Sequence, residues 1–321
     1  MQFDPDRFYV LMEGQPESPE IPFMKRIITK LINVGQLPSV NFQIIAVGGS
    51  ELFNSFARLI YHQSNFHSKI PVLAIRDRDY RKEAELQKQR NKSDENLLNN
   101  KSVRYLYWDR HEWENFLLEE TETLAQIFNA IPVRESGRRQ KLFKRNSLIL
   151  TKSQLDGWLQ EYFQGIVIAE LVECLKFRFY TANICPQLEN PSNDEMSELE
   201  KLRHWFKQPI IASCSTEKLR ENLQFMDSTF DNTLAELDWS NWFNNPLNVN
   251  FNSAKENFRG KEAFFYLFNK ISAAVGLVPQ IKNTEFINNV FLPELERNLN
   301  CLLIRQIQIM LFPYFQKVTD R

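Results

Sequence analysis

The sequence is poor in glycine, cysteine and histidine, and each shortage excludes a class of protein. Nine glycines in 321 residues, against 26 phenylalanines, favour helix-rich packing over a fold with many turns. The four cysteines form no Cys-x-x-Cys pair, so they provide neither a zinc-ligand spacing nor a disulfide framework. The four histidines form no recognisable metal or triad pattern. We therefore expect a protein of the reducing cytoplasm.

Excess charge and long apolar runs are missing as well. The formal net charge is −1, so binding to nucleic acid would need a local basic surface. No apolar run reaches membrane-spanning length, and the polar first seven residues predict no signal peptide. The sequence also has no Gly-x-x-x-x-Gly-Lys-Ser/Thr loop, the motif that cradles the phosphates of ATP. These absences predict a chain that does not associate with membranes and does not itself hydrolyse ATP.

The first third alternates short apolar runs with segments of helical periodicity. Such strand–helix alternation with short connections predicts a parallel sheet with right-handed crossovers. We expect an α/β fold with a four-stranded parallel sheet flanked by helices, the strands being 8–12, 42–47, 71–75 and 103–107 and the helices 21–34, 51–61 and 111–119.

The rest of the chain has mostly helical periodicity. We expect one domain over residues 1–130 and a second, mainly helical one over residues 131–321, which would bind substrate, a partner or a second copy of the chain. The expected helical stretches are 155–179, 198–206, 260–275 and 284–315, and 239–252 is expected to be irregular.

Acidic residues follow three of the four predicted strands. Glu13 follows the first strand, Asp77 and Asp79 the third, and Glu112 and Glu114 the fourth. Functional residues collect at the carboxyl ends of parallel strands. Alternate residues of an extended chain point to one side, so Asp77 and Asp79 should aim together. Carboxylates are ligands for the hard cations that assist phosphodiester hydrolysis, although each could instead be a solvated turn or helix-start residue.

The order of these pieces resembles the Toprim domain of topoisomerases, primases, recombination proteins and the overcoming-lysogenization-defect (OLD) nucleases. The matching segments are a strand that ends Glu-Gly (10–14), one that ends Gly-Gly (44–49) and one that ends Asp-x-Asp (72–79). The segment 107–118, with Glu114-Asn115, is similar to the one after the fourth strand of OLD-like Toprim proteins in phage-defence operons, including the effector subunit of the phage anti-restriction-induced system. The resemblance covers residues 8–120, with a weaker match at Gly260-Lys261.

The resemblance implies a Mg²⁺- or Mn²⁺-dependent endonuclease that cuts DNA or RNA, tRNA included. It would be the effector of an antiviral defence system, and a separate ATPase would control it. The implied catalytic residues are Glu13, Asp77 and Asp79, and the implied metal ligands are Glu13, Glu17, Asp77, Asp79 and Glu114. Two prolines delay the predicted helix start, so Glu20 is the alternative to Glu17.

Basic residues that could contact a nucleic-acid backbone gather in one connector, residues 134–145. We predict contacts from Arg138, Arg139, Lys141, Lys144, Arg145 and, at the head of a later helix, Lys261. The competing interpretation of the connector is a solvated face. A second alternative for the whole chain is a catalytically silent Toprim scaffold that binds protein or nucleic acid. A topoisomerase or primase is disfavoured, since neither a catalytic tyrosine domain nor a primase zinc motif is visible.

Overall fold

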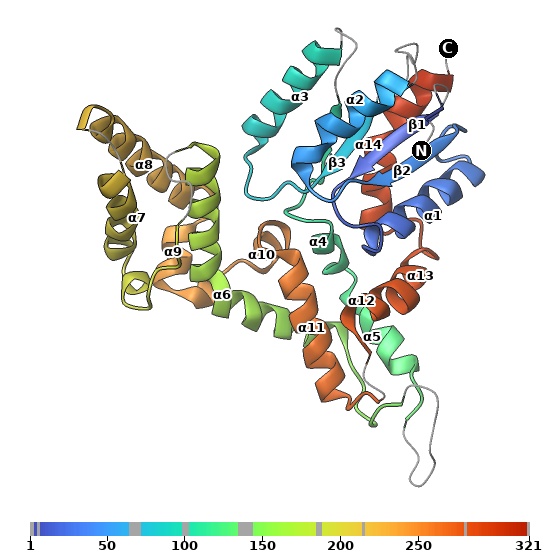
Figure 1. Cartoon of the computed structure of the whole chain (residues 1–321). Helices are drawn as coiled ribbons and strands as arrows, with labels where there is room; N and C mark the ends of the chain where they lie inside the picture. The colour runs from blue at the N-terminus through green and yellow to red at the C-terminus, as the bar shows by residue number, and fades with distance from the viewer. Residues whose placement is uncertain are drawn as a thin grey trace. The chain divides into compact units, whose positions relative to one another are not determined.

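The chain folds into two compact units. The structure, a computed structural model, describes residues 3–4, 7–63, 72–97, 103–133, 144–183, 188–213, 216–278 and 281–319. Unit 1 comprises Met1–Leu155 together with Gly260–Arg321, and unit 2 comprises Asp156–Arg259 (Figure 1). This division differs from the expected boundary at residue 130, because the last part of the chain returns to the unit that contains the sheet.

Unit 1 is built on a four-stranded parallel sheet. The strands are β1 (Phe8–Met12), β2 (Phe42–Ala46), β3 (Leu73–Arg76) and β4 (Arg104–Tyr107), in the spatial order β2-β1-β3-β4. All three neighbouring pairs are parallel. All five residues of β1 are buried, which explains why this strand is a continuous apolar run rather than an alternating one. The predicted α/β class with a parallel sheet is confirmed.

Helices cover both faces of the sheet. One face packs against α2 (Phe53–Gln63), which follows the short 3-10 turn η1 (Ser50–Leu52); Tyr9 and Leu11 share a buried cluster with Phe53 and Ala57. The next residue along a strand points to the other face. There Phe8 meets Phe315 of α14 (Leu302–Thr319), with ring centroids 4.8 Å apart.

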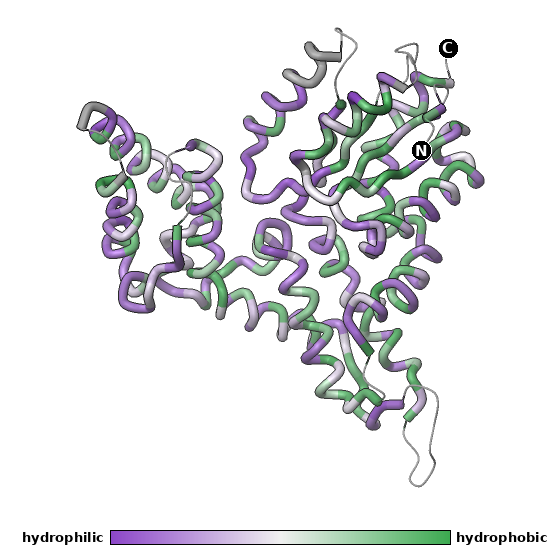
Figure 2. Tube along the Cα trace, viewed as in Figure 1, coloured by the Kyte–Doolittle hydropathy of each residue, from purple (hydrophilic) through white to green (hydrophobic). Residues whose placement is uncertain are grey.

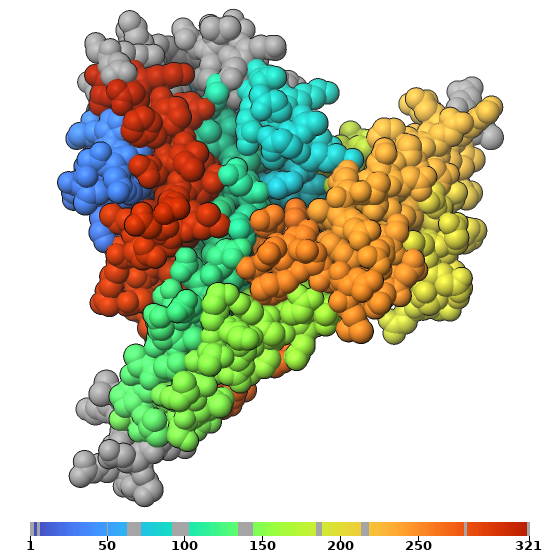
Figure 3. Space-filling model, turned by 180° about the vertical axis from the view of Figure 1, so that it is seen from behind, coloured from blue at the N-terminus to red at the C-terminus, as the bar shows by residue number. Residues whose placement is uncertain are grey.

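The two ends of the chain meet on that second face. Helix α1 (Glu20–Asn33) lies beside α14, as Figure 3 shows from behind. Arg26 of α1 pairs with Glu296 at 2.7 Å, and Gln308 Nε2 donates to Gln36 O at 3.1 Å. These contacts join residues more than 250 positions apart and hold the C-terminal segment in unit 1.

The remaining helices of unit 1 are mostly short. They are α3 (Glu83–Leu97), α4 (Glu114–Leu117), α5 (Thr121–Ala130), α11 (Gly260–Ala274), α12 (Asn283–Phe286), the π-helix η4 (Ile287–Phe291) and α13 (Leu292–Leu295). The expected helical stretch 284–315 is therefore interrupted. Figure 2 shows apolar residues along the strands and polar ones along α3. None of the helices in the described ranges is long and apolar enough to cross a membrane.

Unit 2 is helical. Its elements are α6 (Lys152–Thr181, whose first four residues belong to unit 1), η2 (Glu195–Ser197), α7 (Leu199–Ser213), α8 (Thr216–Glu236), α9 (Trp239–Asn244), η3 (Pro246–Asn248) and α10 (Phe251–Asn257). Trp239 stacks on Phe258 with centroids 5.4 Å apart, and Phe163 meets Phe258 edge-on at 5.7 Å. These aromatic side chains form a core. The expectation of an irregular 239–252 is wrong, since short helices occupy most of it.

Candidate functional site

The acidic residues gather at the carboxyl edge of the sheet. Glu13 directly follows β1, Asp77 directly follows β3, and Glu114 opens α4 shortly after β4. Because the strands are parallel, their carboxyl ends lie at one edge. A cavity of about 230 Å³ opens there, with Trp108 and Trp113 in its wall. Its charged lining consists of Glu13, Glu20, Asp77, Glu112, Glu114 and Lys261.

Glu20, not Glu17, brings the second carboxylate of the N-terminal segment to the cavity. The chain turns after β1 through residues 15–19, so that α1 begins at Glu20. Glu17 lies in this turn, is exposed and does not line the cavity. Gly14 permits the arrangement: its φ is +117°, and a Cβ there would lie 2.6 Å from Glu20 Oε1. Glu17 therefore lies outside the group of carboxylates to which it was assigned, and of the two alternatives it is Glu20 that lines the cavity.

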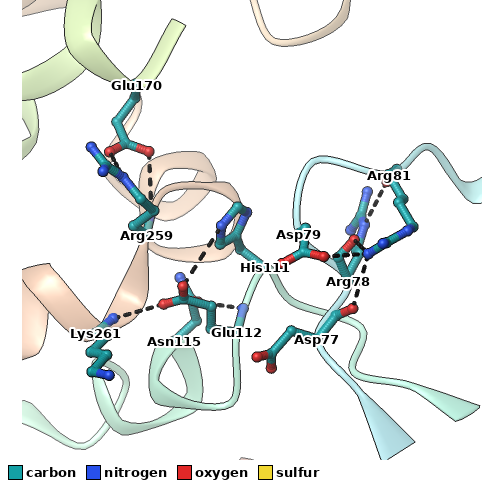
Figure 4. Close-up of polar contacts among 10 residues, drawn as sticks. All are labelled: Asp77, Arg78, Asp79, Arg81, His111, Glu112, Asn115, Glu170, Arg259 and Lys261. Atoms are coloured by element: carbon teal, nitrogen blue, oxygen red, sulfur yellow. Dashed lines mark hydrogen bonds and ion pairs between the residues drawn. The ribbon is translucent and has the colours of Figure 1, made fainter. Parts of the chain in front are cut away.

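Asp79 does not aim into the cavity with Asp77. Strand β3 ends at Arg76, so the alternation of an extended chain does not continue to Asp79. Asp79 adopts a left-handed φ of 52°, and its backbone N–H donates to the carbonyl of His111 at 2.9 Å. Its carboxylate pairs with Arg81 (Figure 4). The expectation that the two aspartates point the same way is wrong because the chain turns between them.

Burial and like charge raise the pKa of two carboxyl groups in the cavity. Burial is the main cause of the pKa of Asp77 lying well above its ordinary range, and the charges of Glu112, Asp79, Glu13 and Glu20 raise it further. The pKa of Glu114 is raised in the same way, by burial first and then by the neighbouring carboxylates, of which Asp77 has the largest effect. These groups are therefore close enough to oppose one another's ionisation.

The pKa of Glu20 is raised by burial and lowered by a nearby positive charge. Burial raises its pKa to about 7, although its backbone hydrogen bond, the Lys261 ammonium and the Ser18 hydroxyl each lower it. The Lys261 side chain is thus within electrostatic reach of Glu20 from the far end of the sequence. Lys261 is the one basic residue among the described residues that line this cavity.

Glu112 and Asn115 attach the start of α11 to the cavity (Figure 4). Glu112 Oε2 accepts a hydrogen bond from the backbone N–H of Lys261 at 2.9 Å, and Asn115 Oδ1 accepts one from the backbone N–H of Glu112 at 2.8 Å. At Gly260 a Cβ would lie 2.5 Å from Asn115 Oδ1 and 2.6 Å from its backbone nitrogen. Only glycine allows so close an approach, which explains the Gly-Lys pair at this helix start.

The donor set fits a hard divalent cation. Carboxylate oxygens are the ligands Mg²⁺ and Mn²⁺ prefer, and a cation would relieve the repulsion that raises the pKa values of Asp77 and Glu114. In the described ranges no three acidic, histidine or cysteine side chains stand close enough to hold a metal ion as they are. The carboxylates therefore line one cavity without forming a ready-made set of metal ligands among the described residues.

The basic connector, residues 134–145, offers fewer described side chains for nucleic-acid binding than the sequence predicted. Arg138, Arg139 and Lys141 lie outside the described residues. Lys144 is half-buried, and its backbone pairs with that of Val278. Arg145 is buried at 4% exposure and donates hydrogen bonds to four backbone carbonyls, those of Asn129, Ile131, Asn146 and Leu148. The prediction that Arg145 contacts nucleic acid is wrong, because its guanidinium is used within the fold.

The roles of Glu112 and Asn115 at the start of α11 were not predicted from the sequence. The neighbours of Glu112 gave no sign that its carboxylate binds a backbone N–H 149 residues away. Asn115 belongs to the segment 107–118 that resembles OLD-like Toprim proteins, but no role was predicted for it; it is fully buried and packs against Gly260. That resemblance and the Gly-Lys pair were the available sequence signals, and no local pattern shows that the two segments meet.

No protein-family model, curated protein or solved structure matches this chain. Any argument about function therefore depends on the residues themselves.

Proposed function

We propose that this protein is a Mg²⁺- or Mn²⁺-dependent nuclease that hydrolyses phosphodiester bonds. One observation carries the proposal: four carboxylates from three separate segments, Glu13, Glu20, Asp77 and Glu114, line one cavity at the carboxyl edge of a parallel sheet. Acidic residues without a functional role are usually dispersed over the surface, where each carboxylate is solvated. Here the carboxylates instead share one cavity, where burial first and their mutual repulsion second raise the pKa values of Asp77 and Glu114.

The residues divide into distinct roles. Asp77, Glu114 and Glu20 would hold the cation, and Glu13 would either share in holding it or accept a proton from the attacking water. A bound divalent cation would neutralise charge on the phosphate and lower the pKa of that water. Asp79 acts from outside the cavity, through its charge and its pairing with Arg81.

The distribution of charge supports a nucleic-acid substrate on unit 1. Residues 1–155 and 260–321 contain 30 basic and 24 acidic residues, a formal charge of +6, in spite of the acidic cavity. Residues 156–259 contain nine basic and 16 acidic residues, a formal charge of −7. The overall charge of −1 conceals this contrast. A polyanion is therefore favoured by unit 1 and repelled by unit 2.

We further propose that the nuclease serves antiviral defence and that a separate ATPase controls it. The support is the similarity of segments 10–14, 44–49, 72–79 and 107–118 to OLD-like Toprim proteins, together with the absence of an ATP-phosphate loop from this sequence. The acidic unit 2 is the part of the chain left for such a partner.

Cleavage of a mixed panel tests the proposed activity. Plasmid DNA, single-stranded DNA and tRNA are incubated with the protein in Mg²⁺ or Mn²⁺, beside folded Glu13→Ala and Asp77→Ala variants. We expect both variants to lose at least about a hundredfold in rate, as for removal of other groups that act on the transition state. Glu122→Ala, which changes an exposed acid outside the cavity, is the matched control. Cleavage that survives both active-site substitutions would refute the assignment.

A binding module without catalysis is the second candidate. It is favoured by the pairing of Asp79 with Arg81 and by the lack of a converged ligand set in the described residues. The two functions differ in their response to metal, since a scaffold need not bind Mn²⁺. Calorimetric titration with Mn²⁺ separates them without requiring the substrate to be known.

A further inference from the structure

Three consecutive residues form the junction at which the chain passes from unit 2 back into unit 1. Each is held by a different side chain. Arg259 donates from its backbone N–H and from Nε to the fully buried Glu170, at 3.2 and 2.6 Å, within unit 2. Gly260 packs against Asn115, and the backbone N–H of Lys261 is bound by Glu112, both within unit 1. Arg259 is therefore held within unit 2, and Gly260 and Lys261 within unit 1, in each case through the backbone.

The contact to Lys261 satisfies one of the amides that every helix leaves without a partner at its start. Helix α11 begins at Gly260, so the Lys261 N–H has no acceptor four residues earlier in the helix. Glu112 Oε2 supplies that acceptor at 2.9 Å, and its negative charge is favourable at the positive end of the helix dipole. The other oxygen, Oε1, lies 3.9 Å from Nε2 of the buried His111. One oxygen of the Glu112 carboxylate is thus committed to the start of α11 although the residue borders the cavity.

Asn115 fixes Glu112 in turn. Its Oδ1 accepts the Glu112 backbone N–H at 2.8 Å, and its buried backbone leaves no room for a side chain at position 260. The result is a chain of contacts from Asn115 through Glu112 to Lys261 (Figure 4). The Lys261 ammonium in turn lowers the pKa of Glu20 by its charge.

We infer that Glu112 and Asn115 are positioning residues. They hold the backbone of Gly260 and Lys261 so that the Lys261 ammonium stays beside the carboxylates, and Glu112 does not ligate the metal. Glu112 therefore acts mainly through the ability of its oxygen to accept a hydrogen bond, and its charge adds a smaller favourable effect at the helix start. The part of this inference that concerns cleavage rests on the proposed nuclease function, but the part that concerns the position of α11 does not.

Glu112→Gln and Glu112→Ala separate these roles. Glutamine keeps an oxygen that can accept from the Lys261 N–H, whereas alanine removes it. Hydrogen–deuterium exchange of the peptide that contains Lys261 reads the contact directly, in the full chain and without substrate. We expect exchange about fivefold faster in Glu112→Ala, the effect of losing one helix cap, and near that of wild type in Glu112→Gln.

Mn²⁺ titration and cleavage complete the test. Glu112→Gln should bind Mn²⁺ within about threefold of wild type and keep most of its cleavage rate, since it retains the acceptor. Glu112→Ala should lose about tenfold or more in cleavage rate through misplacement of Lys261. Gly260→Ala should resemble Glu112→Ala in exchange, because the added Cβ separates the same segments.

Two results would overturn the inference. Unchanged exchange at Lys261 in Glu112→Ala would show that the contact does not hold the helix start. Loss of Mn²⁺ affinity in Glu112→Gln as large as in Asp77→Asn would make Glu112 a ligand. If wild type neither binds Mn²⁺ nor cleaves, the proposed nuclease function fails, and the exchange result alone still decides whether Glu112 positions α11.

Discussion

Glu20→Gln should stabilise the metal-free protein at alkaline pH. Burial raises the pKa of Glu20 from 4.5 to about 7, so the folded protein holds this proton more tightly than the unfolded chain does. The contribution of Glu20 to stability is therefore fully present below about pH 4.5, is lost as the pH rises through about 7, and is absent above that. Glutamine cannot ionise, so the variant avoids the loss.

The size of the effect follows from the same pKa. A rise from 4.5 to about 7, at about 1.4 kcal/mol for each tenfold change in proton affinity, gives an upper bound of about 3 kcal/mol. Glu20 is partly exposed, and solvent screening reduces this to about 1–2 kcal/mol. We expect Glu20→Gln to exceed wild type by that amount in free energy of unfolding at pH 8.5 and to equal it near pH 4.5.

Urea unfolding with a chelator present, followed by circular dichroism, measures both free energies. Glu17→Gln is the matched control, because Glu17 is exposed three residues earlier in the preceding turn and should change stability by no more than about 0.5 kcal/mol at either pH. A Glu20→Gln variant that is no more stable than wild type at pH 8.5 would show that Glu20 is not buried beside the other carboxylates.

Three further predictions use the same unfolding assay. Gly260→Ala should destabilise the protein by about 2–3 kcal/mol because its Cβ would overlap Asn115. Gly157→Ala, with open space at its Cβ in α6, should instead be neutral or stabilising by about 0.5–1 kcal/mol. Equal effects of the two substitutions would contradict the close approach at Gly260. Arg145→Ala should destabilise by about 2–4 kcal/mol through the loss of its hydrogen bonds to backbone carbonyls, and a folded variant with normal stability but weakened DNA binding would restore Arg145 to the nucleic-acid surface. Mn²⁺ at a hundred times its dissociation constant should raise the free energy of unfolding of wild type by about 2.7 kcal/mol, and Asp77→Asn should remove most of that gain; a gain of the same size in the variant would place the metal elsewhere.

The sequence predicted the site best where local geometry decides it. Glu13, Asp77 and Glu114 could be assigned because an apolar run read as a strand fixes where its carboxyl end lies, and parallel strands place those ends together. Lys261 also lines the cavity, whereas the Gly-Lys pair predicted only a contact with nucleic acid and no place among the carboxylates. The α/β class and the four strands followed from the same alternation.

The predictions for Asp79 and Glu17 failed because the backbone conformation of a single turn decides where each side chain points. Strand β3 stops at Arg76 and Asp79 takes a left-handed φ, so the expected alternation ends before it reaches the second aspartate. The turn after β1 ends at Pro19, so the first helical acid is Glu20 and Glu17 remains in solvent. Secondary-structure propensities of the residues do not predict the geometry of these turns, so they could not show which acidic side chains face the cavity.

Long-range contacts were beyond the sequence for a different reason. The hydrogen bond from Lys261 to Glu112 and the ion pair from Arg26 to Glu296 join positions 149 and 270 residues apart. Helical periodicity predicts the separate elements but not which of them meet. The division into units at residues 155 and 259, rather than at 130, depends on these pairings.

Calorimetric titration with Mn²⁺ at pH 8 tests the central claim, that the cavity carboxylates form one metal site, most directly. Wild type would be compared with Asp77→Asn and Glu114→Gln, which remove charge without changing shape, and with the exposed Glu17→Gln as control. We expect saturable binding by wild type and the control, and a loss of affinity of at least about tenfold in each cavity variant. Binding that is equally strong in all four proteins, or absent from wild type, would contradict the account.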